Sequence, residues 1–284
     1  MAKIELFQLN CHKSSAPVAK LSKNLGNYGI ALIQEPNYFK GKLGGSEEHN
    51  TIFAGPKRPR AAILYGRGVN IWKDTRFCGS DLATAILSRE NKPDLYLASL
   101  YLDIKNSGHE VIPSMFANLV DHCLTKGLCL IVGADTNAHS VLWGLETNRR
   151  GEILEDFLAS RGLSVENAGC RPTFVARGTQ SCIDATFSLG NPGVENWRVI
   201  DEDSLSDHML IRFTVGSECS FRKVLVPDLS KANWVSFRSI TEKVRPQTPR
   251  TVSQVWIETE TADFINTIHT ALRQACPQLS LIHI

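Results

Sequence analysis

The sequence has no long apolar run, no closely spaced cysteine pair and no large excess of charge of either sign. A membrane span needs roughly 18 or more consecutive apolar residues, so we expect no membrane-embedded segment. The eight cysteines are scattered, which argues against a structural zinc site and predicts reduced, mostly buried thiols. A formal net charge of +2 does not by itself indicate a polyanionic partner, so such a partner has to be inferred from local residues.

The sequence also lacks internal repeats and a recognisable secretory signal. Its 284 residues, of which 43% are hydrophobic and 21% are charged, have the composition of an ordinary globular protein. This length suits one large domain, or one domain with an appendage. We therefore expect a protein that is neither secreted nor bound to a membrane.

Short strands and amphipathic helices alternate over the first two-thirds of the chain. Strands are predicted at 3–10 and 30–36, as a meander of four strands within 60–103, and at 128–134, 182–189, 196–200 and 208–215. Helices are predicted over 16–26, 109–126 and 149–161. Because the helices lie between groups of strands, we predict an α/β fold in which two packed sheets are flanked by helices.

The composition changes after Gly216, where short apolar patches alternate with prolines. We predict a main domain over residues 1–217 and a linker with a helical appendage over residues 218–284, including an amphipathic helix near 254–275. The last residues show no helix stop signal. We therefore expect the chain to be a fragment of something longer, with the appendage leading toward a further domain.

The stretch IVGADTNAHSVLWG, residues 131–144, places Asp135, Asn137 and His139 at steps of two directly after a buried strand. If the strand continues, the three side chains lie on the same side of it. Polar groups at the end of a buried strand are costly unless something binds them. The same pattern closes or interrupts other predicted strands, at Asn10, Glu35, Tyr101, Asp103, Asp184 and Asp207–His208.

Any one of these residues could be an ordinary turn former or helix cap, but their repeated occurrence at strand ends favours a shared site. Glu35, Asn10 and Asp207 offer hard oxygen ligands, which suit Mg²⁺, with Mn²⁺ as a substitute, better than zinc. These donors indicate metal-assisted hydrolysis of a phosphate ester, in which the metal polarises the phosphoryl group and no protein nucleophile is needed.

The remaining polar residues fit the other tasks of such a reaction. Asp135 is placed to align or deprotonate the attacking water. A pentavalent phosphate carries excess negative charge, and Asn137 and His208 can donate hydrogen bonds to it. Asp184 is then available to orient the His208 imidazole.

The motifs QLN, IQEP, SLYLD, VGADTNAH, CIDATF and LSDH occur in this order over about residues 3–215. Together they resemble the endonuclease/exonuclease/phosphatase superfamily, which includes DNase I and the AP endonucleases. The segment GADTNAHSVLWG, followed by NRRGEILEDFLASRGL and RPTF, resembles the endonuclease domain of non-LTR retrotransposons of the R1/jockey group. Each motif alone is weak, whereas the ordered set is specific.

The resemblance implies a DNase I-like four-layer α/β sandwich of two packed mixed sheets flanked by helices, with its active site at one edge of the sheets. It implies that Glu35 is the principal metal ligand, assisted by Asn10 and Asp207. It also implies that Tyr101 contacts the phosphate or the leaving group, that Asp135 positions the water, and that Asn137 binds the phosphate. His208, paired with Asp184, completes the implied set.

The function that we expect is a Mg²⁺-dependent endonuclease that nicks double-stranded DNA and leaves a 3′-hydroxyl to prime reverse transcription. Its expected context is the nucleus, in a longer protein with a reverse transcriptase and retrotransposon RNA. The alternatives are an AP endonuclease of DNA repair, a phosphatase of lipids or small phosphates, and a non-catalytic relative that only binds nucleic acid. The loops 36–50, 137–150 and 188–198 are candidates for reading the target.

Several further residues have two open interpretations. The basic clusters KRPR (57–60) and NRR (148–150) are either DNA-phosphate contacts or ordinary solvated surface. His139 has either a substrate role or a structural hydrogen bond, with the structural role favoured. Trp143 is expected to pack in the protein, and His12 to lie near the site without taking part in the chemistry.

Overall fold

The computed structural model forms two compact units, Met1–Arg222 and Lys223–Ile284, which are called unit 1 and unit 2 below. The residues that the structure describes are 3–46, 49–54, 58–89, 92–106, 108–176, 178–216, 225–227, 231–242, 263–264, 267–268 and 270–280. All candidate site residues named above lie in unit 1. The assignment of separate roles to residues 1–217 and 218–284 stays a prediction.

Sheet 1 of unit 1 has six strands in the order β15-β16-β1-β2-β6-β5. The strands β1 and β2 are parallel, and the other neighbours are antiparallel, so the sheet is mixed. The bounds are β1 (Ile4–Asn10), β2 (Ile30–Gln34), β5 (Asn50–Phe53), β6 (Ala61–Tyr65), β15 (Val194–Val199) and β16 (Ile211–Val215).

Sheet 2 also has six strands, in the order β11-β14-β10-β9-β8-β7. The central pair, β9 and β10, is parallel, and the remaining pairs are antiparallel. The bounds are β7 (Ile71–Lys73), β8 (Leu82–Arg89), β9 (Lys92–Tyr101), β10 (Cys129–Asp135), β11 (Ser164–Val165) and β14 (Asp184–Leu189).

Helices and short hairpins complete the two units. Unit 1 contains α1 (Ala16–Leu25), α2 (Ser114–Lys126), α3 (Arg149–Arg161), the 3-10 helices η1 (Thr75–Phe77) and η2 (Gly108–Val111), and the hairpins β3 (Tyr38–Phe39) with β4 (Lys42–Leu43) and β12 (Phe174–Ala176) with β13 (Thr179–Ser181). Unit 2 contains α4 (Trp234–Thr241), β17 (Leu225–Pro227) and β18 (Gln278–Ser280). Within the described residues, no helix is both long and apolar enough to cross a membrane.

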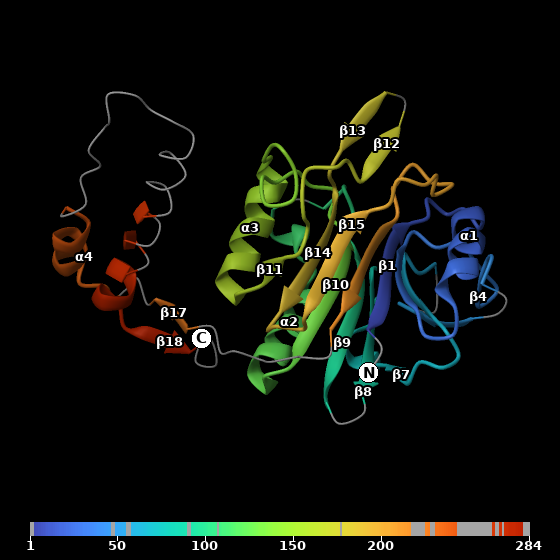
Figure 1. The fold of residues 1–284 in the computed structure, drawn as a ribbon, viewed down its shortest axis with the longest axis horizontal. Coiled ribbons are helices and arrows are strands. Elements are labelled where there is room, and N and C mark those ends of the chain that lie inside the picture. Colours follow the sequence, from blue (N-terminus) through green and yellow to red (C-terminus); the bar gives the residue numbers. More distant parts are fainter. Residues whose placement is uncertain are drawn as a thin grey trace. The chain divides into compact units, whose positions relative to one another are not determined.

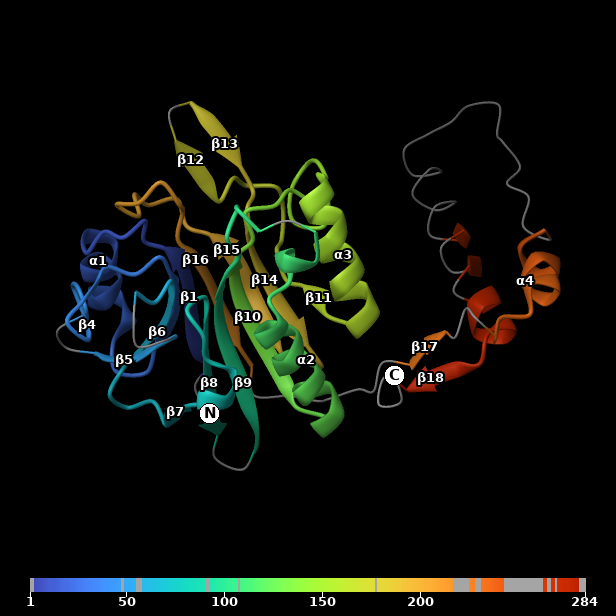
Figure 2. The same cartoon turned by 180° about the vertical axis from the view of Figure 1, so that it is seen from behind.

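The elements of unit 1 stack in four layers, with the two sheets between α1 on one side and α2 and α3 on the other (Figures 1 and 2). Alternate residues of β1 explain this order: Phe7 packs with Leu21 of α1, whereas Leu6 packs between the sheets. On the far side, Phe116 of α2 and Phe157 of α3 pack with ring centroids 5.4 Å apart. The predicted four-layer α/β sandwich is thereby confirmed.

The faces of the two sheets that meet each other change from apolar to polar along the strands. In sheet 2, Gly133 lies in register between Ser99 and Thr186, and Asp135 lies in register between Tyr101 and Asp184. The buried side chains of Gln8 and Gln34 reach these rows from sheet 1. Gln8 Nε2 donates to the carbonyls of Ala134 and Ala185, and Gln34 Nε2 donates to Ser99 Oγ and the Gly133 carbonyl, at 2.9–3.3 Å.

Two predicted segments differ from the observed ones. The expected four-strand meander is divided, because β6 pairs with β2 and β5 in sheet 1, whereas β7, β8 and β9 form the meander in sheet 2. The helix expected over 109–126 begins only at Ser114, because Pro113 stands at its N-cap and a separate 3-10 helix precedes it. The helix expected near 254–275 lies largely outside the described residues.

Two other predictions are confirmed. The helix expected over 149–161 coincides with α3. Cys11, Cys78, Cys123, Cys170, Cys182 and Cys276 are free thiols, and most of them are buried.

Gly133 is expected to be essential for the close approach of the two sheets. A Cβ atom at this position would lie 2.9 Å from Leu32 Cδ1 and 3.0 Å from Gln8 Oε1. We expect Gly133→Ala to lower the free energy of unfolding by about 1–3 kcal/mol, because overpacking in a dense core forces neighbours to move. Chemical denaturation measures this change. Gly79→Ala is the control, because its new Cβ would meet only the flexible Met115 side chain, and an equal loss in both variants would contradict the expectation.

Candidate active site

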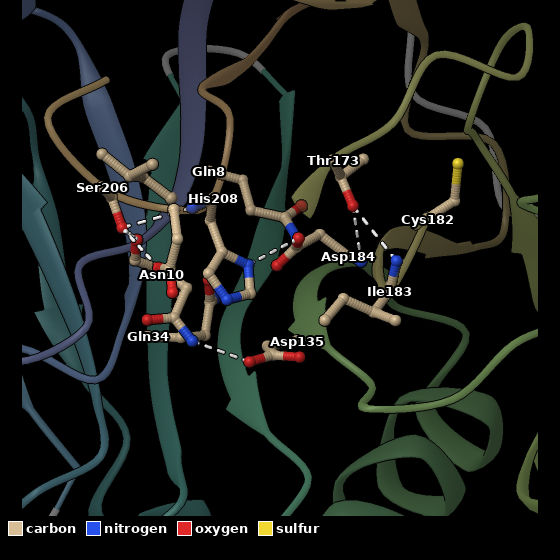
Figure 3. A network of polar contacts seen from close by, with 12 residues as sticks. Gln8, Asn10, Gln34, Asp135, Thr173, Cys182, Ile183, Asp184, Ser206 and His208 are labelled. Atoms are coloured by element: carbon tan, nitrogen blue, oxygen red, sulfur yellow. Dashed lines mark hydrogen bonds and ion pairs between the residues drawn. The ribbon is translucent and has the colours of Figure 1, made fainter. Parts of the chain in front are cut away.

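Two hydrogen bonds across the gap between the sheets define the candidate site (Figure 3). Asn10 Nδ2, at the end of β1, donates to Asp135 Oδ2, at the end of β10, at 2.7 Å. His208, just before β16, lies with Nδ1 at 2.8 Å from Asp184 Oδ2, at the start of β14. Each contact joins one residue near sheet 1 to one residue of sheet 2, so the docking of the sheets creates the site.

Burial and charge shift the protonation of this group. Burial, together with the negative charge of Asp184, raises the pKa of Asp135 to about 7, although His208 and the hydrogen bond from Asn10 oppose the shift. Burial by itself would lower the pKa of His208. The charge of Asp184 and its hydrogen bond outweigh burial and raise that pKa to about 9. His208 is therefore an imidazolium at neutral pH, with Nδ1 facing Asp184 and Nε2 left as a second donor.

Asn137 reaches the site by a turn, so the condition under which Asp135, Asn137 and His139 would share one side of a strand is not met. The strand β10 ends at Asp135, and Asn137 has a left-handed φ of 46°. The Asn137 amide donates to Asp135 Oδ1 at 3.1 Å, and Asn137 Nδ2 donates to the Leu102 carbonyl at 3.0 Å. Aspartate at the first position of such a turn satisfies the backbone locally, which competes with strand extension.

Tyr101 lies beside Asp135 because β9 and β10 are paired in register. Burial raises the pKa of Tyr101 to about 12, with the negative charges of Glu35 and Asp135 adding to the shift. The phenol is therefore un-ionised at neutral pH and remains a hydrogen-bond donor. Tyr101 thus carries an un-ionised donor beside Asp135, its partner in the β9–β10 register.

The three predicted metal ligands lie at the same edge, and a basic side chain lies beside each of the two carboxylates. Glu35 Oε1 is 3.2 Å from Lys13 Nζ, and Asp207 Oδ2 is 2.7 Å from His12 Nδ1. Asn10 Oδ1 accepts a hydrogen bond from the His12 amide at 2.8 Å. Lys13 and His12 are mostly exposed, so a bound cation could replace them beside these oxygens.

A second arrangement of potential metal ligands is also present. Among the described residues, Asp135, Asp184 and His208 bring ligand atoms to within 4.8 Å of one another. Asp184 Oδ1 is buried there without a hydrogen-bond partner. A metal ion bound there would have to displace a proton from a His208 ring nitrogen, because binding and protonation compete for the same lone pair. The predicted ligand set of Asn10, Glu35 and Asp207 stays a prediction.

Backbone strain gathers at this edge. His12, Lys13, Glu35 and Asn137 all have left-handed φ values, between 42° and 59°. Non-glycine residues adopt this region at an energetic cost, and such residues cluster at functional sites where the surrounding structure holds them. The Glu35 amide, for example, donates to the Arg60 carbonyl at 2.9 Å.

The loop after Asp135 is held by the residues of its own sequence signature. Asn148 caps α3 by accepting from the Gly151 amide at 2.8 Å, and a Cβ at Gly151 would lie 1.8 Å from the His139 carbonyl oxygen. Glu155 Oε1 accepts from Ser140 Oγ at 2.6 Å and from Thr147 Oγ1 at 3.1 Å. These contacts give the segment from HSVLWG to NRRGE a structural role in fixing the loop that contains Asn137.

Trp143, His139 and His12 lie around the loop and the edge that carry the candidate site residues. Trp143 is buried and donates from Nε1 to the Ala138 carbonyl at 3.2 Å, so the predicted packing role is confirmed. His139 Nδ1 lies 3.2 Å from Glu146 Oε1, which fits the structural alternative. His12 lies near the site as expected, but its direct contact with Asp207 was not foreseen.

The basic clusters 57–60 and 148–150 each contain one exposed arginine and one less exposed arginine that binds protein oxygens. Arg58 and Arg149 are exposed, with Arg149 Nη1 donating to Glu152 Oε2 at 2.8 Å, whereas Arg150 donates to the carbonyls of Thr136 and Asn106 at 3.0 and 2.7 Å. Arg60 is bound by carboxylates, and Lys57 lies outside the described residues. A hollow of about 680 Å³ opens beside Glu35, lined by Lys13, Glu35, Pro36, Asn37, Tyr38, Arg58, Pro59, Arg60 and Ser80.

Residues 95–212 match the sequence model of a family described as endonuclease-reverse transcriptase. The solved endonuclease domain of TRAS1, a telomere-specific non-LTR retrotransposon, is 25% identical to this chain, with a TM-score of 0.63. That match covers 75% of this chain and 98% of the TRAS1 domain. Unit 1 has the endonuclease/exonuclease/phosphatase fold. The resemblance that we inferred from the ordered motifs is therefore confirmed.

More distant proteins share this fold. The AP endonuclease LMAP from Leishmania major is 10% identical, with a TM-score of 0.59, over 76% of this chain and 88% of that one. The D. rerio TDP2 complexed with a single-strand DNA product is 15% identical, with a TM-score of 0.51, over 76% of this chain and 100% of that one. At these identities the likeness shows the fold alone. No curated protein matches the chain at a significant level.

The sequence patterns assigned no role in the site to Gln8, Gln34 and Arg60, three residues that organise this endonuclease/exonuclease/phosphatase fold around it. Gln8 and Gln34 precede Asn10 and Glu35 in their strands, on the face that meets the other sheet. A change from apolar to polar residues along one face of a strand was the available signal for them. Arg60 was included only as part of a surface cluster.

The His208–Asp184 pair should make stability depend on pH in the metal-free protein. Because folding raises the His208 pKa from 6.5 to about 9, its stabilisation is fully present below pH 6.5 and is lost as the pH rises through about 9. We expect the advantage of the wild type over His208→Gln in urea denaturation with EDTA to be greater at about pH 6 than at about pH 10. The expected difference is on the order of 2–3 kcal/mol. An advantage that stays constant across this range would contradict the assignment of a charged imidazole.

Proposed function

We propose that this chain is a divalent-metal-dependent endonuclease that hydrolyses one phosphodiester bond of double-stranded DNA. The observation that carries the proposal is the buried Asp135 carboxylate, held by Asn10 beside the His208–Asp184 pair at the edge where the two sheets meet. The match to the endonuclease-reverse transcriptase family supports the same reaction class. In this proposal the attacking group is water, so no covalent intermediate with the protein is formed.

Asp135 would act on the attacking water. A pKa of about 7 lets this carboxylate accept a proton near neutral pH, and the hydrogen bonds from Asn10 and the Asn137 amide fix its orientation. Water would attack phosphorus while the bond to the 3′ oxygen breaks, which leaves a 3′-hydroxyl and a 5′-phosphate. The un-ionised phenol of Tyr101 would donate a hydrogen bond to the phosphate or to the departing oxygen.

His208 and Asn137 would donate hydrogen bonds to the negative charge that develops on the phosphate. The His208 imidazolium keeps Nε2 available, since Asp184 occupies the Nδ1 side. Asn137 uses one amide hydrogen for the Leu102 carbonyl and retains the other. Glu35, Asn10 and Asp207 would hold Mg²⁺, with Mn²⁺ as a substitute, and the ion would neutralise phosphate charge when bound.

We further propose that the cleaved DNA is a retrotransposition target whose 3′-hydroxyl primes reverse transcription in the nucleus. The similarity to the TRAS1 retrotransposon endonuclease and the name of the matching family support this context, including a reverse transcriptase and its RNA as partners. Residues 218–284 would be an appendage that the chemistry does not need, because no candidate site residue lies there. DNA repair of the AP endonuclease kind, or binding without cleavage, is the alternative.

The proposed chemistry requires a divalent metal and the Asp135 carboxylate. We expect nicking of supercoiled plasmid with Mg²⁺ to stop in EDTA, and Asp135→Asn to slow single-turnover nicking by a factor on the order of 10²–10⁴ with little change in DNA affinity. Asp121→Asn, which changes an exposed carboxylate on α2, is the matched control and should nick at the wild-type rate. Full nicking in EDTA would exclude the metal-dependent mechanism.

The His208–Asp184 pair should act as one unit in catalysis. If Asp184 works by orienting His208, then either single substitution removes most of the same benefit. We expect the double variant Asp184→Ala/His208→Ala to be far less impaired than the product of the two single losses. The measurement is a double-mutant cycle on single-turnover nicking, and strictly multiplicative losses would show that the two residues act independently.

A further inference from the structure

Arg60, just before β6, makes an unusually dense set of side-chain contacts. Its Nε and Nη2 donate to the two carboxylate oxygens of Asp81 at 2.5 and 2.6 Å, and Nη1 donates to Asp103. The carbon of its guanidinium lies 4.9 Å from the centroid of the Tyr101 ring. One flat cation therefore stacks on the phenol while two carboxylates hold it from the side.

The backbone of the same residue reaches the other side of the site. The Arg60 carbonyl accepts from the amide of Glu35 at 2.9 Å, where Glu35 has its left-handed φ of 42°. Asp81, which binds the Arg60 guanidinium, also contacts the backbone of Tyr101, because its carbonyl accepts from the Tyr101 amide at 2.8 Å. Arg60 thus connects Glu35, at the end of β2 in sheet 1, with Tyr101, at the end of β9 in sheet 2.

Local charge argues against a phosphate-binding role for this arginine. Two carboxylates face a single guanidinium, so the cluster carries no surplus positive charge. Burial lowers the pKa of Arg60, but its hydrogen bonds to Asp81 and Asp103 outweigh burial and raise it. The side chain is 33% exposed, and three of its N–H groups are directed at carboxylates. A DNA phosphate would have to displace bonds that are already made.

We propose that Arg60 is a positioning residue of the nuclease site, which fixes the Tyr101 ring against the backbone that carries Glu35. The inference rests on the proposed function for its catalytic consequence, although the positioning of Tyr101 can be measured without any activity. Arg60 acts through Tyr101 and touches neither the water nor the phosphate. Under this proposal Arg60, the last residue of the cluster KRPR, holds Tyr101 in place and does not bind DNA phosphate.

The first measurement follows Tyr101 directly. The chain has five tyrosines, so 3-fluorotyrosine labelling gives few ¹⁹F NMR signals, and Tyr101→Phe identifies the one from Tyr101. Arg60→Met should shift and broaden that signal. The matched control is Arg76→Met, because Arg76 makes the same fork to Asp74, at 2.9 and 2.6 Å, and lies 5.2 Å from the Phe77 ring centroid. An unchanged Tyr101 signal in folded Arg60→Met would overturn the proposal, even if the wild type cleaves nothing.

The second measurement separates positioning from DNA binding. We expect Arg60→Met to slow single-turnover nicking at saturating DNA by about 10–100-fold, with the apparent Kd and its salt dependence unchanged. Arg60→Lys should not restore the rate, because an ammonium cannot reproduce the planar fork. Arg76→Met should nick at the wild-type rate. Weaker binding, a flatter salt dependence and an unchanged saturated rate would identify Arg60 as a phosphate contact and reject the proposal.

The third measurement asks whether Arg60 acts through Tyr101. Combining Arg60→Met with Tyr101→Phe should cost little more than the larger single loss, whereas multiplicative losses would reject the coupling. If Arg60→Met does not fold, Asp103→Asn gives a milder test, because it removes one anchor of Arg60 and leaves the fork to Asp81. It should move the same ¹⁹F signal and slow the same step to a smaller extent. A wild type that never nicks DNA would refute the proposed function and leave the ¹⁹F result to decide the positioning of Tyr101.

Discussion

The candidate site depends on how the two sheets meet, because its two central hydrogen bonds both cross the gap between them. Asn10 and His208 lie near sheet 1, and their partners Asp135 and Asp184 belong to sheet 2. A slide of one sheet along the other by one residue, roughly 3.3 Å, would separate both pairs. The geometry of the chemistry is therefore set by the packing of two whole sheets, and not by any single loop.

The buried polar residues next to the site, Gln8 and Gln34, keep the two sheets aligned with each other. Apolar packing is tolerant of small slides, whereas buried amides must find particular partners or lose their hydrogen bonds. Gln8 and Gln34 reach carbonyls of the opposite sheet, and Gly133 leaves the space that they need. The core between the sheets thus supplies most of the driving force, while the glutamines specify the alignment that brings Asn10 to Asp135.

Sequence patterns identified the residues that end strands but not those that set their alignment. Asp135 and Asp184 could be recognised because a charged residue interrupts an apolar run. Gln34 within a strand has the same pattern whether it faces water or another sheet, and only the partner sheet decides between the two. The turn that carries Asn137 could not be predicted, because its left-handed φ depends on hydrogen bonds to Asp135 and Leu102 that strand periodicity does not contain.

The pairing of β1 with β16 has a consequence during protein synthesis. The first strand, Ile4–Asn10, lies between β2 and Ile211–Val215, so one of its neighbours is made some two hundred residues later. His208, which precedes β16 by three residues, is synthesised at nearly the same late point. A ribosome-bound chain that has made Asn10, Glu35 and Asp135 but not yet β16 cannot assemble the proposed active centre. Under the proposed chemistry, an unfinished translation product would therefore have no nuclease activity.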